Sequence, residues 1–157
     1  MLLREMSREE CDDLLGRLGY GHLACAHDNQ PYVVPIYFVS DRGHLYGFST
    51  KGQKIEWMRL NPRVCVEADE VLSHSQWASV VVQGHYEEYP DTPEYAAQRH
   101  MAQSLLESKR SLWWQTAFGA AQTRGQFDRD IPILYCIHID EVSGRRVSSD
   151  PGVRSHV

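Results

Sequence analysis

The chain of 157 residues lacks the features that mark membrane proteins and disulfide-rich proteins. No apolar run reaches the roughly 18 residues that a membrane-spanning helix needs, and the first residues, MLLREMSREE, lack the apolar stretch of a signal peptide. The four cysteines, Cys11, Cys25, Cys65 and Cys136, form no CxxC pair, which favours buried reduced thiols over disulfides or metal ligands. We therefore expect a cytoplasmic protein without a membrane partner.

The chain also lacks an excess of basic charge and a metal-binding pattern. The formal net charge is -5 and the isoelectric point is about 5.9, which argues against nucleic acid as a main partner, because phosphate backbones attract clustered Lys and Arg. The eight histidines form no HxxxH or HExxH pattern. We therefore expect surface or cross-strand histidines and no metal site.

The composition that is present indicates one soluble domain. A hydrophobic fraction of 42% and a charged fraction of 24% are those of a globular protein. The chain contains no internal repeat and no low-complexity tract. We expect residues 1–145 to form the domain and residues 146–157 to be a polar tail.

Alternating apolar residues and closely spaced turns predict a mainly β protein. The expected strands are residues 21–27, 31–40, 44–49, 63–70, 76–89 and 131–142. No helix separates the first three strands, which disfavours a doubly wound α/β fold. The pattern favours a closed antiparallel β-barrel with helices around it.

Helices are expected at the start of the chain, in the middle and late in the sequence. Ser7 and Glu10 form an S-x-x-E capping box for a helix that Gly19 ends. The other expected helices are residues 54–60, 91–108 and 111–119. In the first of these three, the inward residues are expected to be Ile55, Met58 and Leu60.

The segment 49–54 is rich in groups that bind phosphate. It supplies two hydroxyls, two lysines, an amide side chain and a glycine at the start of a helix, where backbone N–H groups favour an anion. Its residues are Ser49, Thr50, Lys51, Gly52, Gln53 and Lys54. The alternative is a solvated loop, which is the usual role of this composition.

Two other positions could belong to a binding site. Proline cannot donate to a ladder, so Pro35 inside a strand marks either an edge strand or a place where a ligand meets the backbone. Trp77 and Ser79 share one face of the expected strand 76–89, where they could stack on a flat ring and hydrogen-bond to it. The alternative is that Trp77 is an ordinary core residue.

Four segments in this order resemble the pyridoxamine 5'-phosphate oxidase-like family of FMN-binding split barrels. The segments are PYVVPIYF, LYGFSTKGQKIEWMRLNPRV, SVVVQG and YCIHIDEVSGR. The likeness covers nearly the whole chain to about Arg145, and the branch it resembles most contains nitroimidazole-resistance proteins. It implies a six-stranded antiparallel Greek-key split barrel that forms a homodimer and holds two FMN molecules in clefts between subunits.

The resemblance also implies which residues bind FMN. Lys54 matches the phosphate-binding lysine of the family, one strand lines the isoalloxazine with its backbone, and a second strand approaches the ring from the other side. The implied residues are Val34, Pro35 and Ile36 on the first strand, Phe48, Ser49, Thr50, Lys51, Gln53 and Lys54 around the loop, and Trp77, Ser79 and Val80 on the second strand.

The chain also departs from its relatives. True pyridoxamine phosphate oxidases have R-x-V-L-L-K where PYVVPI stands here and glutamine where Ser79 stands, and their C-terminal arginine and histidine motif is missing. Vitamin B6 oxidation is therefore not expected. Phe48 stands where nitroimidazole-resistance relatives often have a histidine beside the flavin, which argues against nitroreductase activity. No residue presents itself as an acid, base or nucleophile, because in such enzymes the flavin carries the redox chemistry.

Three functions remain open after this comparison. They are an FMN-dependent oxidoreductase with an unidentified small-molecule substrate, a non-catalytic flavin-binding or sensor protein, and a haem-binding split barrel. FMN is expected rather than FAD, because there is one basic loop and no GxGxxG fingerprint. An apolar face around Trp77, Val81, Val33 and Tyr37 predicts a homodimer.

Overall fold

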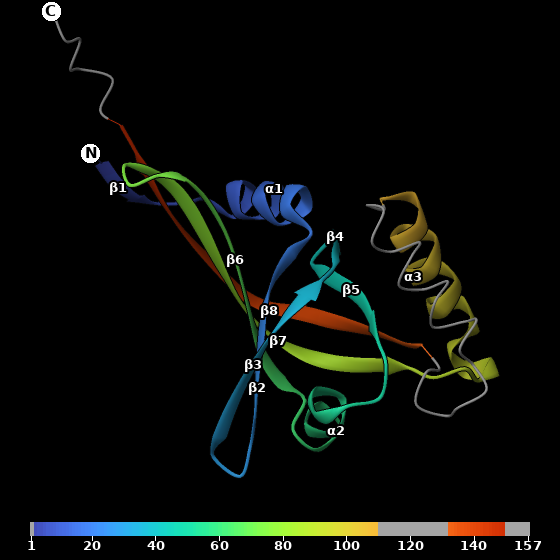
Figure 1. Cartoon of the computed structure of the whole chain (residues 1–157). Helices are drawn as coiled ribbons and strands as arrows, with labels where there is room; N and C mark the ends of the chain where they lie inside the picture. Colours follow the sequence, from blue (N-terminus) through green and yellow to red (C-terminus); the bar gives the residue numbers. More distant parts are fainter. Residues whose placement is uncertain (1, 110–131, 150–157) are drawn as a thin grey trace, which may run out of the picture.

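The computed structural model describes residues 2–109 and 132–149. In that part of the chain, helices surround one antiparallel sheet of eight strands (Figure 1). The elements in chain order are β1 (Leu2–Glu5), α1 (Arg8–Leu18), β2 (Tyr20–His27), β3 (Gln30–Tyr37), β4 (Val39–Asp41), β5 (His44–Ser49), α2 (Gln53–Leu60), β6 (Arg63–Ser73), β7 (Gln76–Tyr89), the 3-10 helix η1 (Pro93–Tyr95), α3 (Ala96–Ser108) and β8 (Ile133–Ser148).

The sheet closes on itself through a bent strand made of β3 and β4. Hydrogen-bonded neighbours follow the order β3-β2-β6-β7-β8-β5-β4, and the single residue Phe38 joins the two ends of that path. Because all the pairings are antiparallel, β3 and β4 run in the same direction and act as one strand that changes its partner from β2 to β5. The path is thus a ring of six strands, to which β1 adds by pairing with β8.

This ring confirms the expected mainly β split barrel. The strand count is eight rather than six for two reasons, the break at Phe38 and the strand β1, which the sequence analysis did not predict. Phe38 itself is 2% exposed, because its side chain fills the interior at the bend.

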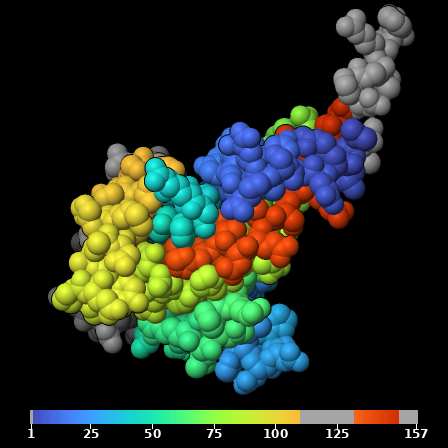
Figure 2. Space-filling view, turned by 180° about the vertical axis from the view of Figure 1, so that it is seen from behind, coloured from blue at the N-terminus to red at the C-terminus, as the bar shows by residue number. Residues whose placement is uncertain are grey.

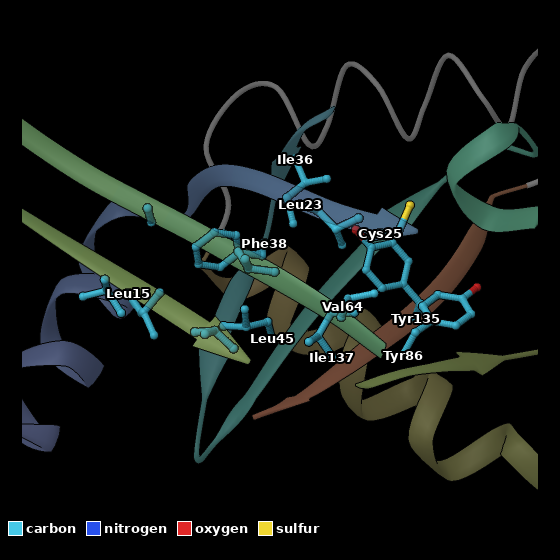
Figure 3. Packing of buried hydrophobic residues seen from close by; sticks show 14 of the residues in the cluster. Leu15, Leu23, Cys25, Ile36, Phe38, Leu45, Val64, Tyr86, Tyr135 and Ile137 are labelled. Atoms are coloured by element: carbon cyan, nitrogen blue, oxygen red, sulfur yellow. The ribbon is translucent and has the colours of Figure 1, made fainter. Parts of the chain in front are cut away.

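Apolar side chains fill two separate spaces. The first is inside the ring, where Leu23, Val80 and Ile137 are each 0% exposed and several strands contribute side chains (Figure 3). The second lies between the outer side of β5 and β8 and helix α3, and contains Leu106 and Cys136. Each fully buried aliphatic side chain contributes about 1.5–3 kcal/mol to folding, so these clusters fix the ring and the position of α3.

Helix α1 begins and ends as the sequence predicts. The Ser7 hydroxyl accepts a hydrogen bond from the N–H of Glu10 (3.2 Å), and the Glu10 carboxylate accepts one from the N–H of Ser7 (2.9 Å). Gly19 ends the helix in the left-handed region, at φ 62°, where a side chain would be strained. The capping box is therefore confirmed.

The expected inward position of Leu60 is wrong. Ile55 and Met58 are buried as expected, but Leu60 is 68% exposed. Leu60 follows Met58 by two residues, which is about 200° around a helix, so its side chain leaves the buried face.

The last strand is longer than expected. We predicted that it ends near Ser143 and Gly144, but β8 continues to Ser148 and pairs with β1 and β7 there. The glycine marks a close approach rather than a turn, because a Cβ at Gly144 would lie 2.7 Å from the Cys11 sulfur. The predicted helix over residues 111–119 lies outside the described residues.

Other expectations concern single residue types. In the described ranges, no helix is long and apolar enough to cross a membrane. Cys11, Cys25 and Cys136 are buried, as expected, while Cys65 is half-buried. Cross-strand histidines are confirmed, since His138 is directly opposite both His44 and His85.

Candidate functional site

The predicted phosphate loop connects the end of β5 to the start of α2. Ser49, the last residue of β5, is 9% exposed, and its hydroxyl donates to the carbonyl of Thr50 (3.0 Å). Thr50, Lys51 and Gln53 are exposed. Gly52 is the N-cap residue of α2 and has no side chain. In the described chain, no side chain therefore accepts a hydrogen bond from the first backbone N–H groups of the helix, which stay open to another acceptor. An uncapped helix start of this kind favours an anion.

Lys54 is the charged residue of the loop that is partly buried. Burial lowers the pKa of Lys54, because removing the ammonium from water disfavours its charged form, while the neighbouring Cys25 thiol has a smaller opposite effect. Within residues 2–109 and 132–149, no carboxylate or hydrogen-bond acceptor pairs with this ammonium. A half-buried cation without a counter-ion is costly, and a bound anion would compensate it.

The loop lies next to the hairpin of β2 and β3. The Trp57 ring on α2 is 5.5 Å from the ring of Tyr32 on β3 and 5.7 Å from that of His27 on β2, measured between centroids. The space-filling view shows the tip of this hairpin against α2 (Figure 2). The structure therefore brings together two of the three predicted parts of the site, the loop and β3.

A seam in the barrel separates these two parts. The ladder between β4 and β5 ends at the pair Val39–Tyr46. If it continued in the same register, Ile36 would face Ser49, but in the described chain β3 pairs only with β2, on its other edge. One side of the seam is thus the edge of β3 and the other is the end of β5, from which the loop begins.

Alternate residues of β3 direct their backbone N–H and carbonyl groups to this seam. The N–H of Phe38 donates to Gly19 on the β2 side, and the ladder has no bulge, so Ile36 and Val34 also direct their backbone groups toward β2. Pro35 and Val33 therefore direct theirs to the seam. The interpretation of Pro35 as an edge-strand residue is confirmed, because its missing N–H lies on the side without a ladder. Of the three residues predicted to line the ring, only Pro35 presents its backbone there.

The third predicted part of the site lies elsewhere in the chain. Val80 is 0% exposed and points into the barrel, whereas Trp77 and Ser79 are half-buried on the outer face of β7. Measured along the curved sheet, three strand spacings, about 14 Å, separate Val80 from Ile36. Glu88, the residue of β7 that contacts α2, follows Trp77 by 11 residues, which is about 36 Å along the strand, so one copy of the chain does not bring the segment from Trp77 to Val80 to the loop. Phe48 packs against the cluster under α3 rather than in the barrel interior.

The structure also contains a groove that the sequence analysis did not find. It has a volume of about 910 Å³ and lies over β2, β6 and β7. Small side chains, Ala24, Ala26 and Cys65, line it, with Arg63 and His85 among its polar residues. The alternation of alanines in β2 is the signal that could have indicated a concave outer face.

Comparison with known proteins gives the family. The pyridoxamine 5'-phosphate oxidase family matches residues 7–146. An uncharacterized protein of Rhizobium meliloti is 41% identical over 145 residues, covering 92% of this chain and 95% of its own. The crystal structure of an FAD-binding protein from Mesorhizobium loti is similar at 45% identity with a TM-score of 0.75, over 94% of this chain and 100% of that one.

A more distant structure shares the fold alone. A protein of Bacteroides thetaiotaomicron assigned to 5-nitroimidazole antibiotic resistance has 17% identity and a TM-score of 0.65, with 93% of this chain and 89% of that chain covered. The family match spans most of the sequence, and a relative well above 30% identity is covered almost completely. This chain therefore belongs to the pyridoxamine 5'-phosphate oxidase-like family of split barrels.

Proposed function

We propose that this protein binds a flavin, with FMN as the cofactor and its phosphate on the loop 49–54. The observation that carries the proposal is the half-buried ammonium of Lys54, which has no counter-ion in the described chain and stands at the uncapped start of α2. A phosphate monoester brings about two negative charges and three acceptor oxygens, which suit this arrangement. Family membership and the FAD-binding relative at 45% identity support a flavin as the carrier of that phosphate.

The activity that we propose is oxidation or reduction of a small molecule by the bound flavin. The flavin supplies the redox chemistry, and the chain binds and orients it. Lys54 and the first N–H groups of α2 hold the phosphate. The edge of β3 offers the N–H of Val33 and the carbonyl of Pro35 to the polar edge of the ring.

Reduction tests the activity separately from binding. If the protein is an enzyme, NADH or NADPH bleaches the absorbance of the bound flavin. A yellow protein that is inert to both would support a non-catalytic binder. A Soret band in the purified protein would instead support the haem-binding alternative.

FAD is a second candidate, because the Mesorhizobium loti relative is an FAD-binding protein. FAD contains the same phosphate next to the ribityl chain, so the loop would serve both cofactors. Titration of the purified protein with FMN, FAD and riboflavin separates them by flavin fluorescence. We expect FMN to bind more tightly than FAD, and riboflavin to bind most weakly because it has no phosphate. Tighter binding of FAD would contradict the choice of FMN.

We also propose a homodimer whose second copy completes the site. Val33 is 62% exposed and Tyr37 is 43% exposed, on the same outer face as the half-buried Trp77 and Val81. Pairing this face across a two-fold axis would cover it in both copies. Such pairing could also place Trp77 of one copy near the seam of the other, which one chain alone does not do.

Sedimentation of apo and FMN-loaded protein at low micromolar concentration tests the dimer. FMN is expected to stabilise the dimer by mass action, since both copies would contact it. A clean monomer that binds one FMN tightly would contradict both the interface and the shared site.

A further inference from the structure

The end of α2 that lies away from the loop is tied to two strands. The Arg59 guanidinium donates to both oxygens of Glu88 on β7, from Nη2 to Oε1 at 2.7 Å and from Nε to Oε2 at 2.8 Å. The hydroxyl of Tyr86, a residue that is 7% exposed, donates to the same Oε2 at 3.2 Å. The Asn61 amide donates to the carbonyl of Ala26 on β2 at 3.0 Å.

These contacts hold a helix that is too short to be stable alone. Helix α2 has eight residues and a length of about 12 Å, and isolated helices below about 12 residues are marginal in water. Ile55 in the first turn and Met58 in the second are each 0% exposed and bury one side of the helix, and no side chain caps its start. The contacts of the last turn limit how the helix can tilt and rotate about this buried side, and so they help to set the orientation of the first turn.

The ion pair is suited to a permanent contact. The Arg59 guanidinium beside Glu88 holds the pKa of that carboxyl below its usual value, with the hydrogen bonds as the main cause. Arg59 follows Lys54 by five residues, so the two side chains leave the helix about 140° apart. Arg59 is therefore directed away from the side of α2 on which Lys54 lies.

We infer that the Arg59–Glu88 pair, together with Tyr86, is a positioning device that sets how α2 presents Lys54 and its first N–H groups to the phosphate. The inference rests on the proposed function. It makes Arg59 a residue that acts through the helix and does not touch the cofactor. Its loss lets α2 occupy orientations in which the loop does not fit a phosphate.

Comparing FMN with riboflavin measures this effect, because the two ligands differ only in the phosphate. In Arg59→Met, the affinity for FMN is expected to fall about three- to tenfold as loop arrangements that do not bind phosphate become populated. The affinity for riboflavin is expected to stay within about twofold of the wild type. The readout is the ratio of the two affinities, which a general loss of stability does not change.

A second variant distinguishes positioning from direct contact. Glu88→Gln keeps the shape of the side chain and removes its charge, which releases Arg59. If Arg59 itself contacted the phosphate, its release would leave the FMN affinity unchanged or raise it. Positioning predicts that Glu88→Gln lowers the FMN to riboflavin ratio, as Arg59→Met does. Arg59→Lys, which keeps the charge but not the two-pronged geometry, is expected to lie between wild type and Arg59→Met.

Arg17→Met is the matched control. Arg17 on α1 forms a similar two-pronged pair with Glu70 on β6, and neither residue belongs to the loop or to α2. This variant is expected to keep the wild-type ratio. A wild-type ratio in Arg59→Met, or an equal loss for both ligands, would overturn the inference while leaving the proposed function intact. A wild type that does not prefer FMN to riboflavin would overturn both.

Discussion

Helices α1 and α2 both cover part of the barrel, but they differ in how their polar groups are paired. Helix α1 has a complete capping box at its start, a left-handed glycine at its end, and ion pairs to its neighbours through Arg4–Glu10 and Arg17–Glu70. Helix α2 has no side-chain cap at its start and carries Lys54 without a counter-ion in the described chain. The first helix satisfies its own polar groups, and the second leaves those at its start without a side-chain partner in the described chain, where we propose that the phosphate binds.

Under the proposed function, this difference assigns stability to α1 and cofactor binding to α2. An uncapped start and a half-buried cation cost free energy in the absence of an anion. Contacts at the other end of α2, above all those of Arg59 and Asn61, offset part of that cost. Variants in one helix that leave the other unchanged therefore test whether stability and FMN binding can be altered separately.

The largest effect on stability is expected from the buried face of α1. Leu15 is 0% exposed, and Leu15→Ala removes its packing and leaves a cavity. We expect the free energy of unfolding to fall by about 2–5 kcal/mol, with FMN affinity unchanged in the folded protein. Urea unfolding and FMN titration measure the two quantities. The control is Glu9→Ala on the exposed side of α1, for which we expect a change below about 0.5 kcal/mol.

For α2 we expect the reverse, a variant that lowers FMN affinity without lowering stability. Lys54→Ala removes a charge-assisted contact of about 1.5–3 kcal/mol, so FMN affinity should fall roughly ten- to hundredfold. The apo protein should be at least as stable as the wild type, because the change removes a half-buried charge that has no counter-ion. Lys51→Ala is the control, since Lys51 is exposed and should contribute less. Unchanged FMN affinity in Lys54→Ala would place the phosphate elsewhere.

How much the sequence predicts differs between these two regions. The ends of α1 follow from Ser7, Glu10 and Gly19 alone, because capping is local chemistry. The bounds of β5 and β7 also match the prediction, since alternation and turns define them. The candidate loop is likewise visible as a cluster of lysines and hydroxyls in the sequence.

Features that depend on distant contacts were not predictable. Strand β1 exists because it pairs with the far end of β8, 140 to 146 residues away along the chain, and nothing local indicates that partner. The sequence alone suggests a turn at Gly144, but the structure shows that a side chain there would collide with the sulfur of Cys11. The separation of Trp77 from the loop follows from the order of strands in the barrel, which composition does not specify.

A side-chain cap at the start of α2, like the one at the start of α1, should raise the stability of the apo protein and weaken FMN binding. Gly52 has an extended backbone that any residue can adopt, and a Cβ there would meet only a carbonyl oxygen 4.0 Å away. Gly52→Asp is expected to stabilise the apo protein by about 0.5–1 kcal/mol, because the carboxylate accepts from the first N–H groups. It should also weaken FMN binding, because it occupies those donors and repels phosphate.

Ser7→Ala is the counterpart of this change on α1. It should cost about 1 kcal/mol and leave FMN affinity unchanged. Urea unfolding and FMN titration of both variants give the four values that are needed. If Gly52→Asp bound FMN as tightly as the wild type, the start of α2 would not be the phosphate site.

The smallest effect is the pH dependence, in which the charged form of Glu10 on α1 stabilises the fold and the charged form of Lys54 on α2 destabilises it. The hydrogen bonds from Arg4 and the cap at Ser7 lower the pKa of Glu10 to about 2, from 4.5 in the unfolded chain. Glu10 therefore contributes stability above pH 4.5 that is lost as the pH falls from about 4.5 to 2. Glu10→Gln should reduce the loss in that window, which urea unfolding at each pH measures.

Lys54 should act at alkaline pH, where the loss of its destabilising charge raises stability. Its pKa is lowered below 10.5 in the folded protein, so the unfolded chain binds more protons there and the free energy of unfolding should rise with pH as Lys54 deprotonates. Lys54→Ala should remove that rise. Bound FMN should also remove it, because a phosphate beside Lys54 favours the charged form and raises its pKa again. An alkaline rise that is the same in the apo wild type, in Lys54→Ala and in the FMN complex would show that another group titrates, and that Lys54 is not the cation that the phosphate neutralises.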